Sequence, residues 1–136
     1  MNVQHDATHQ SPLAHISTRF VQLHKDYYGR GPERAKTYFQ DDLVVVLMRG
    51  GFTKVEETLL QDGRGESLLQ QRRDFQAAMR PRFKEVIEEE LGRKVSGFMS
   101  GSHQHPDLLA EIFILERESG EFLEDAQAGD GLPGGR

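Results

Sequence analysis

The sequence has no cysteine, and this absence excludes several kinds of chemistry. Without cysteine the chain forms no disulfide bonds, uses no thiol nucleophile and offers no thiolate to a metal. Long hydrophobic runs are also missing, because the longest, LVVVLM at residues 43–48, has only the length of a strand. A bilayer-spanning helix needs roughly 18 to 20 apolar residues. The first residues, MNVQHDATHQSP, lack the pattern of a secretory signal. We therefore expect a cytoplasmic protein that does not itself span a membrane.

A basic net charge is lacking too, and the acidic charge lies at the two ends of the chain. The formal net charge is -5. Residues 116–136 contain six acidic and two basic residues, and residues 1–9 contain one acidic residue, so the part between them is neutral. Tight binding to a nucleic-acid backbone needs a dense basic surface. A nucleic-acid partner is therefore not expected.

The length of 136 residues fits one domain. Residues 1–10 are polar and unpatterned, and residues 117–136 end in the glycine-rich, acidic segment QAGDGLPGGR. Such segments bury too little apolar surface to fold. We predict that both ends are disordered and that a single domain spans residues 11–116.

The first periodic pattern predicts an amphipathic helix. Ser11 can cap a helix, and Pro12 fits its first turn. Apolar residues then recur at spacings of three and four, namely Leu13, Ile16, Phe20, Leu23 and Tyr27. Gly29 is expected to end this helix.

A capping-box pattern at Thr53 and Glu56 predicts a second helical region, which reaches Leu91. An unbroken helix over residues 54–91 would be about 57 Å long at ~1.5 Å per residue. We therefore expect either a break around Gly63 or packing of the long helix on a second subunit. The apolar stripe keeps its phase across Pro81, which predicts a kink there rather than a break.

Four segments have strand patterns, in two pairs. Residues 36–40 and 43–48 flank an acidic turn, and residues 94–100 and 108–115 flank the loop GSHQHPD. The order α-β-β-α-β-β predicts a two-layer α+β fold, with a mostly antiparallel four-stranded sheet and helices on one face. LVVVLM does not alternate, which is typical of a strand covered on both faces. We therefore predict a homodimer in which a second subunit supplies the missing cover.

The segment YYGRGP, residues 27–32, is the first candidate for a binding site. Glycines let backbone N–H groups approach an anion, and arginine can bind phosphate or carboxylate with two hydrogen bonds. The predicted ligand-binding residues here are His24, Tyr28, Gly29, Arg30 and Gly31. We expect a positive φ at Gly31. The alternative is that the segment only stops a helix and leads into a strand.

Two further segments can complete a pocket with this one. Arg80 and Arg82 flank the helix proline and would form a second basic wall, unless they are simply solvated charges. His103 and Asp107 lie in the GSHQHPD loop, where a histidine can bind a ligand or transfer a proton. A lone HxH pattern is weak evidence for a metal. We predict no metal, no cofactor and no catalytic residue, since triad, P-loop and dinucleotide motifs are absent from the sequence.

Several segments together resemble the MpsC family. They are LHKDYYGRGPERAKTYFQDDLVVVL, GFTKVEETLL, FQAAMRPRFKEVIEEELGRKVSGFMS and HQHPDLLAEIFILE. The resemblance covers residues 12–116. In the last loop the family pattern is matched at His103, Pro106 and Asp107. It is not matched at Gly101, Ser102 and His105, where the family commonly has acidic residues or asparagine.

The resemblance implies a link to a membrane-potential-generating system that moves sodium or other cations and supports uptake of bicarbonate. Membrane transport subunits would be the partners of this chain. We predict a cytosolic, non-enzymatic accessory or regulatory domain that binds a small anion. Two alternatives stay open: a small enzyme that uses His103, Asp107 and the arginines on an anionic substrate, or a nucleic-acid-binding regulator.

Overall fold

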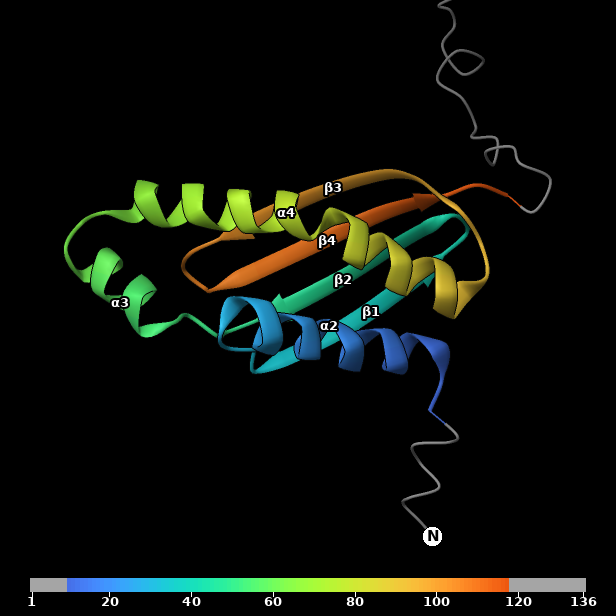
Figure 1. The fold of residues 1–136 in the computed structure, drawn as a ribbon, viewed down its shortest axis with the longest axis horizontal. Helices are drawn as coiled ribbons and strands as arrows, with labels where there is room; N and C mark the ends of the chain where they lie inside the picture. Colours follow the sequence, from blue (N-terminus) through green and yellow to red (C-terminus); the bar gives the residue numbers. More distant parts are fainter. Residues whose placement is uncertain (1–9, 118–136) are drawn as a thin grey trace, which may run out of the picture.

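The computed structural model describes residues 10–117, so the predicted disorder of residues 1–10 and 117–136 falls almost entirely outside it (Figure 1). Three helices and four strands occur within this range. They are α2 (Pro12–Tyr28), β1 (Arg34–Gln40), β2 (Leu43–Arg49), α3 (Lys54–Gln61), α4 (Gly65–Leu91), β3 (Val95–His103) and β4 (Leu108–Leu115). The predicted element order is confirmed, with one additional helix.

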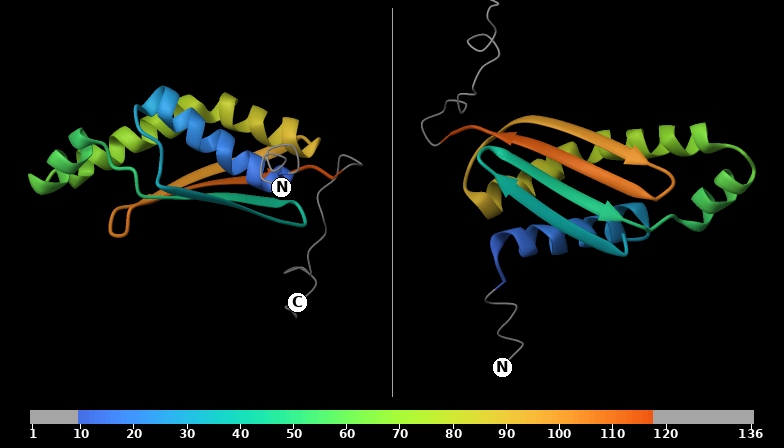
Figure 2. Two further views of the ribbon diagram at one scale, coloured as in Figure 1. Left: turned by 90° about the horizontal axis from the view of Figure 1, so that it is seen from below. Right: turned by 180° about the vertical axis from the view of Figure 1, so that it is seen from behind.

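The four strands form one sheet in the order β1-β2-β4-β3, and every neighbouring pair is antiparallel. Both predicted strand pairs are therefore present. The left view of Figure 2 shows α2 and α4 on one face of the sheet. The prediction of a two-layer α+β fold with helices on one face is confirmed.

Local sequence signals explain where the helices begin and end. The Ser11 side chain accepts a hydrogen bond from the Ala14 N–H group, and the capping box between Thr53 and Glu56 is complete. The long helical region breaks at Gly63, whose φ is 73°, and this break produces the additional helix. α4 continues through Pro81, as predicted. Figure 1 shows that its axis changes direction part-way along its length.

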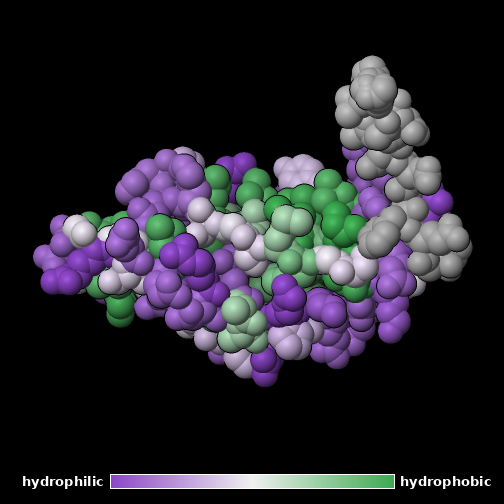
Figure 3. All heavy atoms as spheres, turned by 90° about the horizontal axis from the view of Figure 1, so that it is seen from above, coloured by the Kyte–Doolittle hydropathy of each residue, from purple (hydrophilic) through white to green (hydrophobic). Residues whose placement is uncertain are grey.

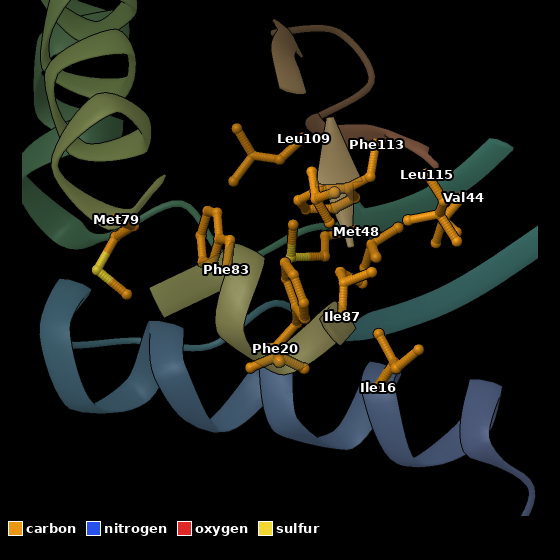
Figure 4. Packing of buried hydrophobic residues seen from close by; sticks show 13 residues of the cluster. Ile16, Phe20, Val44, Met48, Met79, Phe83, Ile87, Leu109, Phe113 and Leu115 are labelled. Atoms are coloured by element: carbon orange, nitrogen blue, oxygen red, sulfur yellow. The ribbon is translucent and has the colours of Figure 1, made fainter. Parts of the chain in front are cut away.

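The hydrophobic core lies between the two long helices and the sheet (Figure 4). The rings of Phe20 and Phe83 stack with centroids 4.7 Å apart, and Phe113 meets Phe20 edge-on at 6.1 Å. All three rings are fully buried. Each such side chain stabilises the fold by roughly 1.5–3 kcal/mol relative to an exposed one. These rings attach both helices to β4.

The opposite face of the sheet is apolar and is not covered by any helix of residues 10–117 (Figure 2). In β2, Val44, Val46 and Met48 point to the helices, so the alternate residues of the run point away. We call this second surface the open face. Its apolar residues are Tyr38, Leu43, Val45, Leu47, Met99, Ala110, Ile112 and Ile114. Figure 3 views the molecule from the β3 side, with the sheet seen from its edge, and shows hydrophobic residues gathered in the central part of this view.

Candidate functional site

The predicted binding corner begins where α2 ends, after Tyr28. Gly29 has a left-handed conformation with a φ of 91°. The expected positive φ at Gly31 is wrong, because Gly31 is not among the positive-φ glycines of the described chain. Gly31 instead lacks room: an added Cβ would lie 2.9 Å from Lys25 Cγ and 3.1 Å from the Val21 carbonyl oxygen. The two glycines are thus needed for different physical reasons.

Next to this corner, the guanidinium of Arg72 binds two carboxylates. Arg72 comes from α4 and is only 2% exposed. Its Nε donates to Glu56 Oε2 at 2.9 Å, and its Nη1 donates to Asp107 Oδ1 at 2.7 Å. Glu56 belongs to the first turn of α3, and Asp107 precedes β4. One buried side chain therefore ties α4 to two other elements.

Glu56 is the centre of this network. Its Oε1 accepts a hydrogen bond from the Thr53 N–H group at 2.9 Å, and its Oε2 accepts from the Tyr28 hydroxyl as well as from Arg72. Burial alone would raise the pKa of Glu56. Hydrogen bonds from Arg72, Tyr28 and the Thr53 backbone outweigh burial, and the pKa is lowered. The carboxylate is therefore ionised at neutral pH, and both of its oxygens accept hydrogen bonds.

Tyr28 is held as a neutral hydrogen-bond donor. Burial and the hydrogen bond to Glu56 raise the pKa of its hydroxyl to about 12. The same oxygen accepts a hydrogen bond from Gln71 Nε2 at 2.9 Å. Its ring packs edge-on against Phe75, with centroids 4.5 Å apart.

His24 lies on the inner side of the same corner and is 1% exposed. Its Nδ1 lies 2.9 Å from the Phe20 carbonyl oxygen and donates a hydrogen bond to it. Burial lowers the pKa of His24, and the positive charge of Arg72 adds to this, so the ring is neutral. Nε2 is buried and has no hydrogen-bond partner within the described residues. The imidazole stacks on Phe83, which indicates a packing role.

A second buried polar cluster lies between α4 and the sheet. Glu111 is fully buried on β4 and accepts hydrogen bonds from Gln76 Nε2, at 2.7 Å, and from the Ser100 hydroxyl. No ion pair within residues 10–117 involves it. Burial raises its pKa to about 7, although the two hydrogen bonds lower it. This carboxyl group therefore titrates near neutral pH.

The other predicted site residues are dispersed. Arg30 is exposed and donates from Nη1 to the Phe52 carbonyl oxygen at 3.0 Å, which places it at the edge of the network. Arg80 lies over the ring of Phe98 on β3, whereas Arg82 lies over the ring of Tyr27 on α2. These two arginines therefore contact different elements.

His103 makes its hydrogen bond within the β3–β4 turn and not with the network. Its Nδ1 lies 2.8 Å from the carbonyl oxygen of Pro106, within its own loop. Of the predicted site residues, the structure brings together His24, Tyr28 and Asp107 around Glu56 and Arg72. Within residues 10–117 there is no group of three or more side chains that could hold a metal.

Sequence reasoning missed the polar residues that organise this site. They are Glu56, Arg72, Gln76 and Glu111. Arg72 and Gln76 occupy the helical positions between Leu68 and Met79 on the buried stripe of α4. The sequence signal for these two residues was a polar side chain at a helical position where the stripe is otherwise apolar. It identifies a buried polar side chain, but it does not identify the partner.

Comparison with known proteins gives one family and one relative. The family described as "Na+-translocating membrane potential-generating system (MpsC)" matches residues 8–117. The relative is "Uncharacterized protein YrhF" of Bacillus subtilis (strain 168), which is 24% identical over 112 residues. This alignment covers 79% of the chain and 89% of the relative. No solved structure matches the chain with statistical significance.

Proposed function

This chain belongs to the MpsC family, and from that premise we propose that it is an accessory or regulatory domain of a membrane-potential-generating system. None of the helices within residues 10–117 is long and apolar enough to cross a bilayer. On this proposal, separate membrane subunits carry the transport of cations or bicarbonate. The domain acts from the cytosol by contacting them.

The chemistry of the corner supports a non-enzymatic role. Glu56 and Asp107 are both engaged by Arg72, and Tyr28 donates to the same Glu56 carboxylate. A general base needs a carboxylate or imidazole that can reach a substrate proton. The acidic groups here are hydrogen-bonded to neighbouring elements, and His24 is enclosed by aromatic rings. The network is better suited to fixing the positions of α3, α4 and the β3–β4 turn than to turnover.

The observation that carries the interaction role is the open face. Tyr38, Leu43 and Met99 are 48%, 39% and 54% exposed on it. Four strands about 4.8 Å apart, with about seven residues each at ~3.4 Å, give a face of roughly 450 Å² in projection. A contiguous apolar patch of this order is within the roughly 300–600 Å² of the largest patch on a typical monomer, which is often a functional surface. This projected area is a little over half of the ~800 Å² that each partner buries in a standard interface.

We propose that a second copy of the chain covers the open face, so that the functional unit is a homodimer. Such an interface is self-complementary, because the same patch meets itself across a two-fold axis. The centre of the face is the register pair Val45 and Ile112, one from each middle strand. A charge at this centre would be buried without a partner in the dimer.

The test is the molar mass in solution, measured by light scattering at tens of micromolar protein. The wild type should have twice the mass of the 15.5 kDa chain, and Val45→Lys should be monomeric. Val55→Lys makes the same change on α3, where the side chain is 60% exposed, and should leave the dimer intact. A monomeric wild type, or equal behaviour of the two variants, would exclude the open face as the dimer interface. Circular dichroism checks that both variants fold.

Binding of a small anion at the corner is the second part of the proposal, and it depends on Arg30. Arg72 is already neutralised by Glu56 and Asp107. Arg30 has an exposed guanidinium with one hydrogen bond, to the Phe52 carbonyl oxygen, and the remaining N–H groups can bind a ligand.

A further inference from the structure

Two arginines face each other directly across the β1–β2 ladder. Arg34 and Arg49 are register partners, and both are exposed on the side of the sheet away from the helices. Directly opposed residues have Cβ atoms about 4.5–5.5 Å apart, and like charges in this arrangement destabilise a sheet. An anion bound between the two side chains would remove this repulsion.

A third base lies on the same side, two residues along β1. Lys36 is exposed, is paired in register with Leu47, and its Nζ lies 5.5 Å from the centre of the Tyr38 ring. The surface is hollowed here. A depression of about 540 Å³ is lined by Arg34, Ala35, Lys36, Tyr38, Leu47 and Arg49.

Two acids near this end of the sheet point to the helix side. Asp107 is hydrogen-bonded to Arg72, and Glu111 is buried beneath α4. The Glu33 carboxyl group lies against Gly50, where an added Cβ would be 2.9 Å from Glu33 Oε1. Glu33 lies in the bend before β1. None of the ion pairs within residues 10–117 involves the three bases of the depression.

We propose that this depression binds a phosphate group, in the form of a phosphomonoester. A phosphomonoester carries a charge of about -1.5 to -2 at pH 7 and has three acceptor oxygens. Two guanidinium groups can each donate two hydrogen bonds to different edges of one phosphate. A carboxylate has a single charge and only two oxygens, so it satisfies one arginine. The Tyr38 ring and Leu47 offer an apolar surface to the group that the phosphate is attached to.

This site differs from the corner predicted from the sequence and does not require the homodimer, although it shares Tyr38 and Leu47 with the face that a second copy would cover. Its polar residues are at one end of the open face, whereas Val45 and Ile112 mark the centre. Val45→Lys would add a fourth cation opposite Tyr38 in the β1–β2 register, so the monomeric variant for this measurement is the uncharged Ile112→Asn at the centre of the open face, which keeps all three bases. Measuring ligand binding to this variant as well as to the wild type therefore separates failure of the phosphate site from failure of the dimer.

The test uses glycerol 3-phosphate and inorganic phosphate as probes, with chloride at matched ionic strength as the reference. Both phosphates should raise the Tm of the wild type, and calorimetry should give a Kd that Arg34→Gln or Arg49→Gln weakens by about tenfold or more. Arg73→Gln removes an exposed base from α4 and should bind like the wild type. In buffer without phosphate, Arg34→Gln should melt at a higher temperature than the wild type, because it relieves the repulsion.

A second arm distinguishes a dissolved ligand from a lipid headgroup. Vesicles of phosphatidylcholine with phosphatidic acid are compared with vesicles of phosphatidylcholine alone in a sedimentation assay. Binding of the free phosphates assigns the site to a dissolved phosphomonoester, and binding only to the phosphatidic acid vesicles assigns it to a headgroup. Binding to none of these, or equal binding by Arg34→Gln and Arg73→Gln, overturns the proposal.

Discussion

Replacing Arg72 with methionine tests the central network of the fold. The change leaves Glu56 and Asp107 buried without their cation, while the length of the side chain is roughly preserved. Removing one partner of a buried ion pair costs about 3–5 kcal/mol. For a domain of this size, such a loss lowers the Tm by about 10 °C or more. Urea unfolding followed by circular dichroism measures the free energy directly.

The same helix provides the control. Arg73→Met makes the identical substitution at the next position of α4, where the side chain is exposed. Exposed charges contribute at most about 1 kcal/mol. If Arg72→Met and Arg73→Met change the unfolding free energy equally, the network does not hold the elements together as argued.

The pH dependence gives Arg72→Met a distinct signature. In the wild type the pKa of Glu56 is below its ordinary value of 4.5. The stability that it contributes is present above pH 4.5 and is lost as the pH falls through the lowered folded-state pKa. Without Arg72, burial dominates and raises this pKa. The variant should therefore gain stability as the pH falls from 7 towards about 4.5, and the added substitution Glu56→Gln should restore part of the loss at pH 7.

Three further predictions concern other parts of the chain. Glu111→Gln should stabilise the protein above pH 7 by on the order of 3 kcal/mol. The pKa of Glu111 is raised to about 7, so its contribution to the free energy of unfolding declines as the pH rises from 4.5 to about 7. An unchanged pH profile of urea unfolding would contradict this. Arg30→Ala should abolish anion binding at the corner without loss of stability, whereas Gly31→Val should lower the Tm through crowding with Lys25. The assay is calorimetry with an anion that binds the wild type. Unchanged binding by Arg30→Ala would end the hypothesis of an anion site at the corner. Pro81→Ala should keep or raise the Tm, since it supplies a helical amide to an exposed position of α4; a large fall would mean that the kink is required for folding.

The elements of this fold were predictable because their signals are local. A capping box, a left-handed glycine and an apolar stripe each act within a few residues, and they located α2 and the start of α3. Strand patterns on either side of two turns located the four strands. The break at Gly63 was one of two open possibilities, and packing in a single compact domain decided it. The length of α4 across Pro81 followed from the phase of its apolar residues.

The polar network was not predictable in the same way. Glu56 was recognised for its local capping role, but its ion pair with Arg72 joins positions 16 residues apart. The ion pair between Arg72 and Asp107 joins positions 35 residues apart. Such pairs exist only once the helices and the β3–β4 turn are in place. The corner looked basic in sequence because Arg30 could be counted, whereas the acids that balance the corner come from distant segments.

The distribution of charge through the fold bears on where a partner binds. At the end of the sheet near Gly50, the N–H group of that glycine donates to the Asp107 backbone carbonyl at 3.0 Å, so the two segments are in contact. The Asp107 side chain points towards Arg72 on the helix side, and the neighbouring Arg49 points to the open face. Glu56 and Asp107 are thus paired with Arg72 on the helix side, while bases and apolar side chains share the open face. Groups contribute to binding energy when they exchange contacts with water for contacts with a partner. Such solvent-exposed groups are concentrated on the open face rather than in the corner, where the polar side chains already bind one another.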